Sequence, residues 1–224
     1  MLQQARQGML QVTIPATNNM AQVAVRIVGW ENTGWRHFFY NSENPIEGPD
    51  DLAELNMRVP PNPIMLGTYE SWNASPAPIA WNELYSALQQ GVVEGGDNPV
   101  SDIIGMKFNE VINRITRLNY TLLTHPIVVS ERWFQGLEPG IQEAVLRAGR
   151  ETTEYVRWWQ PLDESRWWEI AKEAGVQITE IEDETSWKEQ ARDSWPNYYE
   201  MIGEDGEELV DTALNILENY EESN

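Results

Sequence analysis

Residues 57–91 of the chain read MRVPPNPIMLGTYESWNASPAPIAWNELYSALQQG. The stretch predicts four elements in order: a strand at 57–59, a helix from 62 to about 72, an extended piece at 76–80 and a helix at 81–91. Asn62 followed by Pro63 is typical of a helix start, because the asparagine side chain accepts hydrogen bonds from the first amides of the helix. Strands that alternate with helices in this way predict an α/β fold.

The rest of the chain continues the alternation. Further strands are predicted at 10–14, 23–30, 127–130 and 176–181, and a short strand at 92–94 is expected to run into a glycine turn. The strand at 23–30 is mostly apolar, which predicts burial on both of its faces. A long helix is predicted from Pro139 to about residue 174, with Gly175 ending it and Pro161 kinking it.

Composition excludes several classes of function. The 224 residues carry 15 Lys and Arg against 36 Asp and Glu, for a net charge of −21. Such a charge repels phosphate, which argues against nucleic acid and against anionic membrane surfaces as partners. Cysteine is absent, so disulfides, thiolate metal sites and cysteine nucleophiles are excluded. Neither a metal site nor a cofactor is predicted.

Two further features of the sequence bear on where the protein works, namely its balance of arginine and lysine and its lack of long apolar runs. Twelve of the fifteen cations are arginine, and few lysines with excess acid is typical of proteins from salt-loving organisms, in which salt screens self-repulsion. The chain has no apolar run of the roughly 18 residues that a spanning helix needs, so direct membrane insertion is not expected. Residues 1–8 lack the apolar core of a signal peptide.

Three polar residues lie where short predicted strands end in turns, which is where ligands bind in α/β sheets. Arg36 lies among aromatic residues and is a candidate anion clamp, or a surface arginine stacked on Trp35. Arg58 lies on a short apolar strand, where a buried guanidinium needs a partner. That partner is either a ligand carboxylate or an internal acid such as Glu54 or Asp97. Asn98 either contacts a ligand or caps the next helix.

Trp81 stands between the extended piece and the helix that follows, and it is a candidate wall of a ligand pocket. The two histidines, His37 and His125, are expected to be structural or to support other site residues. An enzyme using Glu94 and Asp97 as acid and base is an alternative function, but the chain shows no arrangement of a nucleophile with a base.

Several segments together resemble the DctP-type extracytoplasmic solute-binding subunits of tripartite ATP-independent periplasmic (TRAP) transporters. The matching segments are residues 34–38, 49–52, 57–60, 76–95, 97–99 and 107–111. Their order and spacing place the resemblance between about residues 30 and 175. It implies a periplasmic-binding-protein-like α/β fold with two lobes joined by crossing strands. Residues 1–29 with 120–224 would form the first lobe and the C-terminal helices, and residues 30–119 the second lobe.

The resemblance also implies a function and its residues. Arg58 corresponds to the main carboxylate-binding arginine, Arg36 to a second ligand-contacting arginine and Asn98 to a ligand-contacting amide. Trp81 stands where the family has an aromatic wall, usually phenylalanine, and Gly96 stands where a larger side chain is usual. The implied role is capture of a small organic acid in the periplasm or outside the cell, for membrane permease subunits, without catalysis.

The beginning of the chain departs from the family pattern. The family starts with a strand and helices well before the segments that match here, so the first lobe is expected to lack parts. The alternative that follows is a fragment of such a protein without binding activity. The ligand itself is left open, because dicarboxylates, keto acids, sugar acids and sialic-type acids all satisfy one or two arginines.

Overall fold

The computed structural model describes residues 9–16, 19–53 and 55–221. The chain forms two compact units. Unit 1 comprises Met1–Arg36, Asn98–Gly105 and Asn119–Ala174, and unit 2 comprises His37–Asp97, Met106–Leu118 and Gly175–Asn224. These divisions differ from the lobes expected from the sequence, since residues 175–224 belong to the unit that holds most of 30–119. The lobe boundaries themselves stay a prediction.

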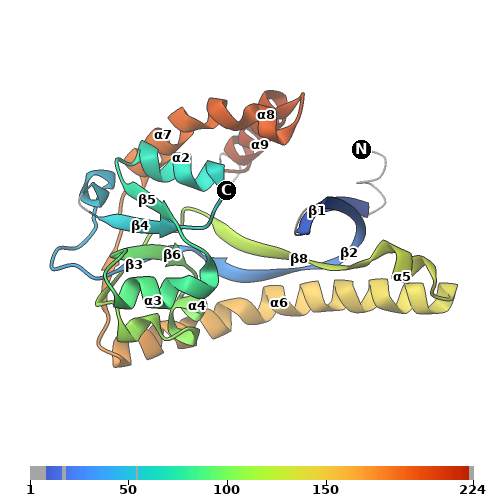
Figure 1. Ribbon diagram of the computed structural model, residues 1–224, viewed down its shortest axis with the longest axis horizontal. Helices are drawn as coiled ribbons and strands as arrows, with labels where there is room; N and C mark the ends of the chain where they lie inside the picture. Colours follow the sequence, from blue (N-terminus) through green and yellow to red (C-terminus); the bar gives the residue numbers. More distant parts are fainter. Residues whose placement is uncertain (1–8, 17–18, 54, 222–224) are drawn as a thin grey trace. The chain divides into compact units, whose positions relative to one another are not determined.

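Unit 1 is built on an antiparallel sheet with the strand order β1-β2-β8. Its elements are β1 (Met9–Ala16), β2 (Asn19–Trp35), β8 (Leu122–Ser130), α4 (Val100–Gly105), α5 (Glu131–Gln135) and α6 (Pro139–Glu173). Helix α6 runs along β2 (Figure 1). A Cβ at Gly149 would overlap the carbonyl oxygen of Val28, so glycine lets the helix backbone lie directly on the strand. The Trp30 amide donates to Thr153 Oγ1 at 2.8 Å across the same contact.

The prediction that the strand at 23–30 is buried on both faces is wrong for its described side chains. Trp30 is 47% exposed, and Val25 and Ile27 are only partly buried. An antiparallel sheet needs only one covered face, and α6 packs against β2. Arg26 instead forms a two-bond ion pair with Glu131, with Nε to Oε2 at 2.9 Å and Nη2 to Oε1 at 2.7 Å.

Unit 2 is built on a mixed six-stranded sheet with the order β5-β4-β6-β3-β7-β9. Its strands are β3 (His37–Tyr40), β4 (Asn56–Val59), β5 (Ser75–Pro78), β6 (Gly95–Asn98), β7 (Arg114–Arg117) and β9 (Gln177–Glu180). Strand β4 pairs in parallel with β5 and β6, β7 in parallel with β9, and β3 antiparallel with β7. The result is the mixed α/β architecture that the sequence predicts.

Helices lie between these strands and after β9, the last of them. They are η1 (Pro49–Leu52), α2 (Pro63–Ser71), η2 (Trp81–Glu83), α3 (Leu84–Gln89), η3 (Phe108–Glu110), α7 (Thr185–Ser194), η4 (Trp195–Tyr198), α8 (Tyr199–Ile202) and α9 (Gly206–Glu221). Successive strand residues point to opposite faces of a sheet, and on β3 this sends Phe38 into an aromatic cluster. Its ring meets Tyr69, Trp72 and Trp187 at centroid distances of 5.8, 5.9 and 5.4 Å. The cluster is the core that ties α2 and α7 to the sheet.

Two local predictions are confirmed. Asn62 Oδ1 accepts hydrogen bonds from the amides of Ile64 and Met65 at the start of α2. Helix α6 ends at Glu173, and Gly175 follows with a left-handed φ of 83°. Pro161 lies inside α6, and the kink there stays a prediction. None of the helices in the described residues is long and apolar enough to cross a membrane.

The predicted glycine turn at 95–96 is wrong. Gly95 and Gly96 are part of strand β6, inside the sheet. A Cβ at Gly95 would lie within 2.3 Å of the Phe39 carbonyl oxygen. The glycine is therefore needed for close packing of neighbouring strands and not for a turn.

Candidate functional site

Arg58 is held in a defined orientation on β4, the strand next to the β5 edge of the unit 2 sheet. It is 3% exposed and donates from Nε to the Ile79 carbonyl at 2.9 Å. One fixed hydrogen bond at Nε sets the plane of the guanidinium, whose geometry matches a carboxylate with two parallel bonds. Of the internal acids considered as alternative partners, Glu54 lies outside the described residues, and Asp97 is fully buried on the adjacent strand β6.

Trp81 stands over this arginine. The Arg58 guanidinium carbon lies 5.6 Å from the Trp81 ring centroid, within range of a cation–π contact. Phe108 supports the indole edge to face at 5.5 Å. Trp81 is 37% exposed, so part of this aromatic wall faces outward. Arg58 and Trp81, which the sequence analysis gives as candidate residues of the ligand pocket, therefore lie next to each other.

Gly96 borders the same strand. A Cβ there would lie 3.0 Å from the Phe39 ring and 3.3 Å from the Arg58 carbonyl oxygen. The space next to Arg58 on β6 is therefore already filled by the neighbouring strands. A larger side chain at this position would require the Phe39 ring to shift.

Arg36 and Asn98 come together in unit 1. Arg36 directly follows β2, its amide donates to the Thr121 carbonyl at 2.9 Å, and its side chain is 6% exposed. Its Nη2 donates to Asn98 Oδ1 at 3.5 Å, the outer limit of a hydrogen bond. The alternative of an arginine lying exposed on the surface is wrong, since both side chains are buried.

Asp102 completes this group, and the sequence analysis missed it. Asn98 Nδ2 donates to Asp102 Oδ2 at 2.9 Å. Burial raises the pKa of the Asp102 carboxyl above its ordinary value, while the bond from Asn98 and the charge of Arg36 oppose the rise. The spacing of four residues across the start of a helix was the available signal. Asp102 holds the Asn98 amide with its oxygen directed to Arg36.

The histidines have different surroundings. His37 is fully buried on β3. His125, on β8, lies 3.3 Å from Glu31 Oε1 and is half exposed. Within the described part of the chain, no three His, Asp or Glu side chains are grouped so that they could hold a metal ion.

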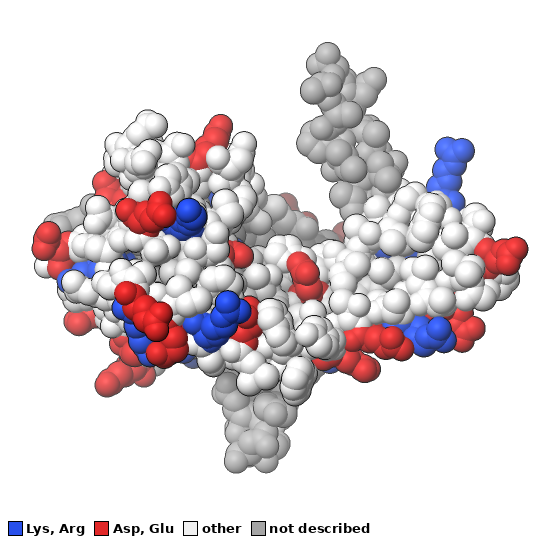
Figure 2. All heavy atoms as spheres, turned by 90° about the horizontal axis from the view of Figure 1, so that it is seen from below, with Lys and Arg blue, Asp and Glu red and all other residues white. Residues whose placement is uncertain are grey.

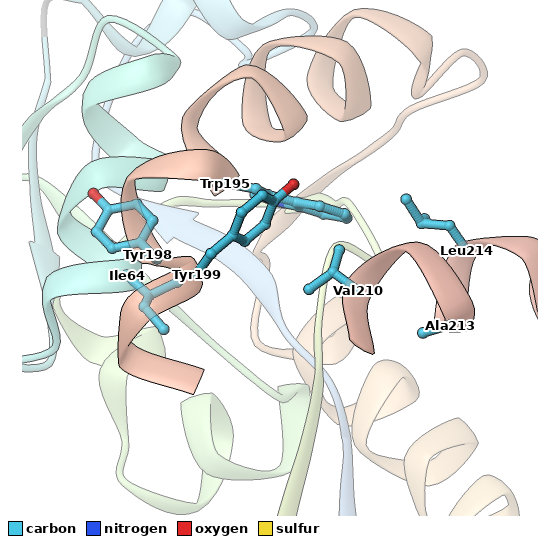
Figure 3. A pocket seen from close by; sticks show the side chains of 7 residues that line it. All are labelled: Ile64, Trp195, Tyr198, Tyr199, Val210, Ala213 and Leu214. Carbon is cyan, nitrogen blue, oxygen red and sulfur yellow. The ribbon is translucent and has the colours of Figure 1, made fainter. Parts of the chain in front are cut away.

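The structure also contains an apolar cavity that the sequence did not indicate. Its volume is about 340 Å³, and α2, η4, α8 and α9 contribute its lining. Figure 3 shows the lining residues Ile64, Trp195, Tyr198, Tyr199, Val210, Ala213 and Leu214. None of the predicted site residues is among them, and an apolar lining provides no charge for a carboxylate.

The charged side chains on the surface agree with the acidic composition of the chain. Figure 2 shows acidic side chains in several groups on the face it displays, with basic side chains set among them. Arg36 and Arg58 are each buried within a chain whose net charge is −21.

The fold resembles that of solved periplasmic solute-binding proteins. It matches a TRAP periplasmic solute-binding protein from Rhodobacter sphaeroides with a TM-score of 0.70 and 35% identity, covering 81% of this chain and 60% of that one. It also matches a TRAP periplasmic solute-binding protein from Sulfitobacter sp. NAS-14.1 with bound β-D-galacturonate. That match has a TM-score of 0.77 and 27% identity, and covers 84% and 61% of the two chains.

The family itself follows from the sequence match. Residues 2–201 match the family described as bacterial extracellular solute-binding protein, family 7 (DctP), and the chain belongs to this family. A solute-binding protein of Sulfitobacter sp. (strain NAS-14.1) is 35% identical over 147 residues, which are 65% of this chain and 44% of that protein. The chain spans about half the length, or less, of the curated relatives it matches.

Proposed function

We propose that this chain is the receptor, or part of the receptor, that captures a small organic acid by its carboxylate for a TRAP-type permease. The observation that carries the proposal is Arg58, a guanidinium that is buried, fixed at Nε by Ile79 and covered by Trp81. Membership of the extracellular solute-binding family supports the class of function. The galacturonate held by the Sulfitobacter structure supports the class of ligand.

The chemistry of Arg58 favours a carboxylate over a neutral solute. A carboxylate accepts two parallel hydrogen bonds from a guanidinium, and burial strengthens both by excluding water. Trp81 adds an apolar wall against which the carbon skeleton of an organic acid can pack. Arg36 and Asn98 are proposed as further ligand-contacting groups, because both are buried and Asp102 orients the Asn98 amide.

The proposal describes binding without turnover. It places the protein in the periplasm or outside the cell, where its family acts, with the permease subunits as its protein partner. A net charge of −21 slows the approach of an anion, and salt screens this repulsion. Association with an acid ligand should therefore become faster at moderate salt, before salt weakens the pairing with Arg58.

The test is a thermal-shift screen with uronates, aldonates, keto acids and dicarboxylates in low and high salt, followed by calorimetry of each hit. Arg58→Met should weaken binding at least about hundredfold, because it removes a buried charged partner. Arg58→Lys keeps the charge but loses the two-bond geometry and should be intermediate. Arg132→Met, which removes an exposed arginine of α5, is the matched control.

The possible results of this screen distinguish carboxylate capture from the alternative functions. A hit that survives in Arg132→Met and disappears in Arg58→Met supports carboxylate capture. Equal binding by both variants would show that the ligand is held elsewhere. Cooperative melting with no hit from any acid class would support the alternative of a fragment without binding activity, and turnover of a hit would overturn binding alone.

A further inference from the structure

A second cavity lies within unit 1, where β2, α4 and α6 contact one another. Its volume is about 330 Å³, which is near the lower end of the range for ligand pockets. Arg36 and Asn98 do not line it, so its lining differs from that of the candidate carboxylate site. Glu31 and Trp159, which do line it, are exposed. The cavity is therefore open to solvent.

The lining is acidic, and its described residues include no lysine or arginine. Its four carboxylates are those of Glu31, Asp102, Asp163 and Glu164. Burial raises the pKa of the Asp102 carboxyl, the hydrogen bond from Asn98 and the charge of Arg36 lower it, and the charge of Glu31 raises it again. Two carboxylates of the lining thus lie near enough to repel each other, and a bound cation would relieve that repulsion.

Basic side chains beside the cavity balance part of this charge. His125 Nδ1 lies 3.3 Å from Glu31 Oε1, and Arg166 Nη1 lies 4.0 Å from Asp163 Oδ1. The side chains of His125 and Arg166 are 51 and 70% exposed, so solvent weakens both pairs. Even when His125 is protonated, these two residues and Arg36 bring three positive charges to four carboxylates.

Gln160 presents a free hydrogen-bond acceptor to this cavity. Its side chain lines the cavity and the residue is only 9% exposed. Gln160 Nε2 donates to Glu164 Oε2 at 2.8 Å, and because an ionised carboxylate only accepts, this bond leaves Oε1 as the other end of the amide. Oε1 accepts no hydrogen bond from the described residues, and protein atoms do not enclose it.

The backbone holds this amide in place. A Cβ at Gly34 would lie 2.8 Å from Gln160 Nε2, so the turn at Gly34 packs directly on the side chain. A fixed and largely buried acceptor without a partner is costly, and a ligand that donates an N–H to it would remove that cost.

Two indole rings provide apolar walls. Trp159 and Trp167 both line the cavity, and Trp167 Nε1 donates to Asp163 Oδ2 at 2.7 Å. Aromatic rings beside carboxylates are typical of sites that hold organic cations. A bare metal ion is not indicated, because no three His, Asp or Glu side chains are grouped to hold one in the part of the chain that the structure describes.

We propose that this cavity binds a small organic ammonium ion that carries at least one N–H group. The ammonium group donates to Gln160 Oε1, and the carboxylates of the lining, Asp163 and Asp102 among them, balance its charge. The carbon skeleton packs against Trp159 and Trp167. The proposal does not depend on the proposed capture of an organic acid, because neither Arg58 nor Trp81 lines this cavity.

The first test is isothermal titration calorimetry of the 224-residue chain with benzylammonium chloride, at an ionic strength held constant with sodium chloride and without any organic acid. The expected result is saturable binding with a Kd of about 1 mM or lower. Benzyl alcohol lacks the charge and benzyltrimethylammonium lacks the N–H, so each should bind at least about tenfold more weakly. Equal affinity for benzyltrimethylammonium would show diffuse attraction to an acidic surface and would overturn the proposal.

The second test uses variants of the lining. Asp163→Asn removes one charge and keeps an oxygen that can accept from Trp167, and it should raise the Kd for benzylammonium about tenfold. The matched control is Glu143→Gln, an exposed acid of α6 that lies twenty residues, or about 30 Å, before Asp163 along the helix. It removes the same charge and should leave the Kd unchanged.

A third variant separates the acceptor from the charge. Gln160→Leu should raise the Kd for benzylammonium about tenfold and leave the weaker binding of benzyltrimethylammonium unchanged, because only the first ligand donates to Oε1. Thermal melting of each variant checks that it is folded, and Asp163→Asn still decides the question if Gln160→Leu does not fold. No saturable binding up to about 10 mM, or an equal change of Kd in Asp163→Asn and Glu143→Gln, would overturn the proposal.

Discussion

Asn98 Nδ2 donates a 2.9 Å hydrogen bond to Asp102 Oδ2, four residues further along the chain. The bond fixes the orientation of the Asn98 amide, and this orientation decides whether its oxygen faces Arg36, whose guanidinium can only donate hydrogen bonds. Because Asp102 is an acceptor when ionised, it holds the amide nitrogen and leaves Oδ1 directed to Arg36 Nη2 at 3.5 Å. A partly buried carboxylate thus positions a candidate ligand-binding amide.

Asp102→Asn should increase the free energy of unfolding at neutral pH. Burial raises the pKa of Asp102 in the folded chain, so folding favours its protonated form. Its contribution to stability is fully present below the unfolded-state pKa and is lost as pH rises through the raised folded-state pKa. Urea unfolding at pH 7 and near pH 4 should therefore show a larger gain from the substitution at pH 7.

Asp193→Asn, an exposed residue of α7, is the control for this substitution because it removes the same charge without the burial. A gain of equal size in both variants would trace the effect to the net charge of −21 and not to the burial of Asp102.

Glu131→Gln should have the opposite pH dependence. The hydrogen bonds from Arg26 lower the pKa of Glu131 in the folded chain, so its stabilising contribution is present above the unfolded-state pKa and is lost as pH falls through the lower folded-state pKa. At pH 7 the substitution should lower the free energy of unfolding by about 2 kcal/mol, because it leaves the largely buried Arg26 guanidinium without its charge partner. The cost should shrink as the pH approaches 3, and a cost that does not depend on pH would contradict the charge pairing.

Local signals explain what the sequence predicted well. Asn62 caps the start of α2, and Gly175 marks the end of α6. Both signals lie within a few residues of the helix end that they define, so a short stretch of sequence is enough to predict them. Arg58 and Trp81 were each predicted as candidate ligand-pocket residues, and the resemblance to the family assigned both to one site. The parallel pairing of β4 with β5 places the segments that carry them side by side.

Tertiary contacts explain what the sequence did not predict. Gly95 and Gly96 have the local character of a turn, but the position of β3 beside β6 makes them strand residues. The contact of Arg36 with Asn98 joins residues 62 positions apart, and nothing in either segment specifies it. Asp102 was missed because an acid in the first turn of a helix has a sufficient local explanation in the helix dipole.

Trp187→Ala should destabilise unit 2 by about 4 kcal/mol, because it leaves a large cavity in a fully buried aromatic cluster. Trp187 is 1% exposed, meets Phe38, and stands edge to face with Trp72 at 5.2 Å. The Trp72 indole donates to the Trp187 carbonyl, and this bond survives the substitution. Thermal unfolding measures the loss, and Trp133→Ala at a half-exposed site should cost less than about 1 kcal/mol.

Gly149→Ala should destabilise unit 1 by about 3 kcal/mol, because the added methyl group overlaps the Val28 carbonyl and forces α6 away from β2. Gly140→Ala is the matched control in the same helix. A Cβ at Gly140 meets no atom within 4 Å, so the change should be neutral or stabilise the chain by up to about 1 kcal/mol through helix propensity. Chemical unfolding of both variants separates the two effects. Equal stability of the two variants would show that β2 and α6 are not in backbone contact at Gly149.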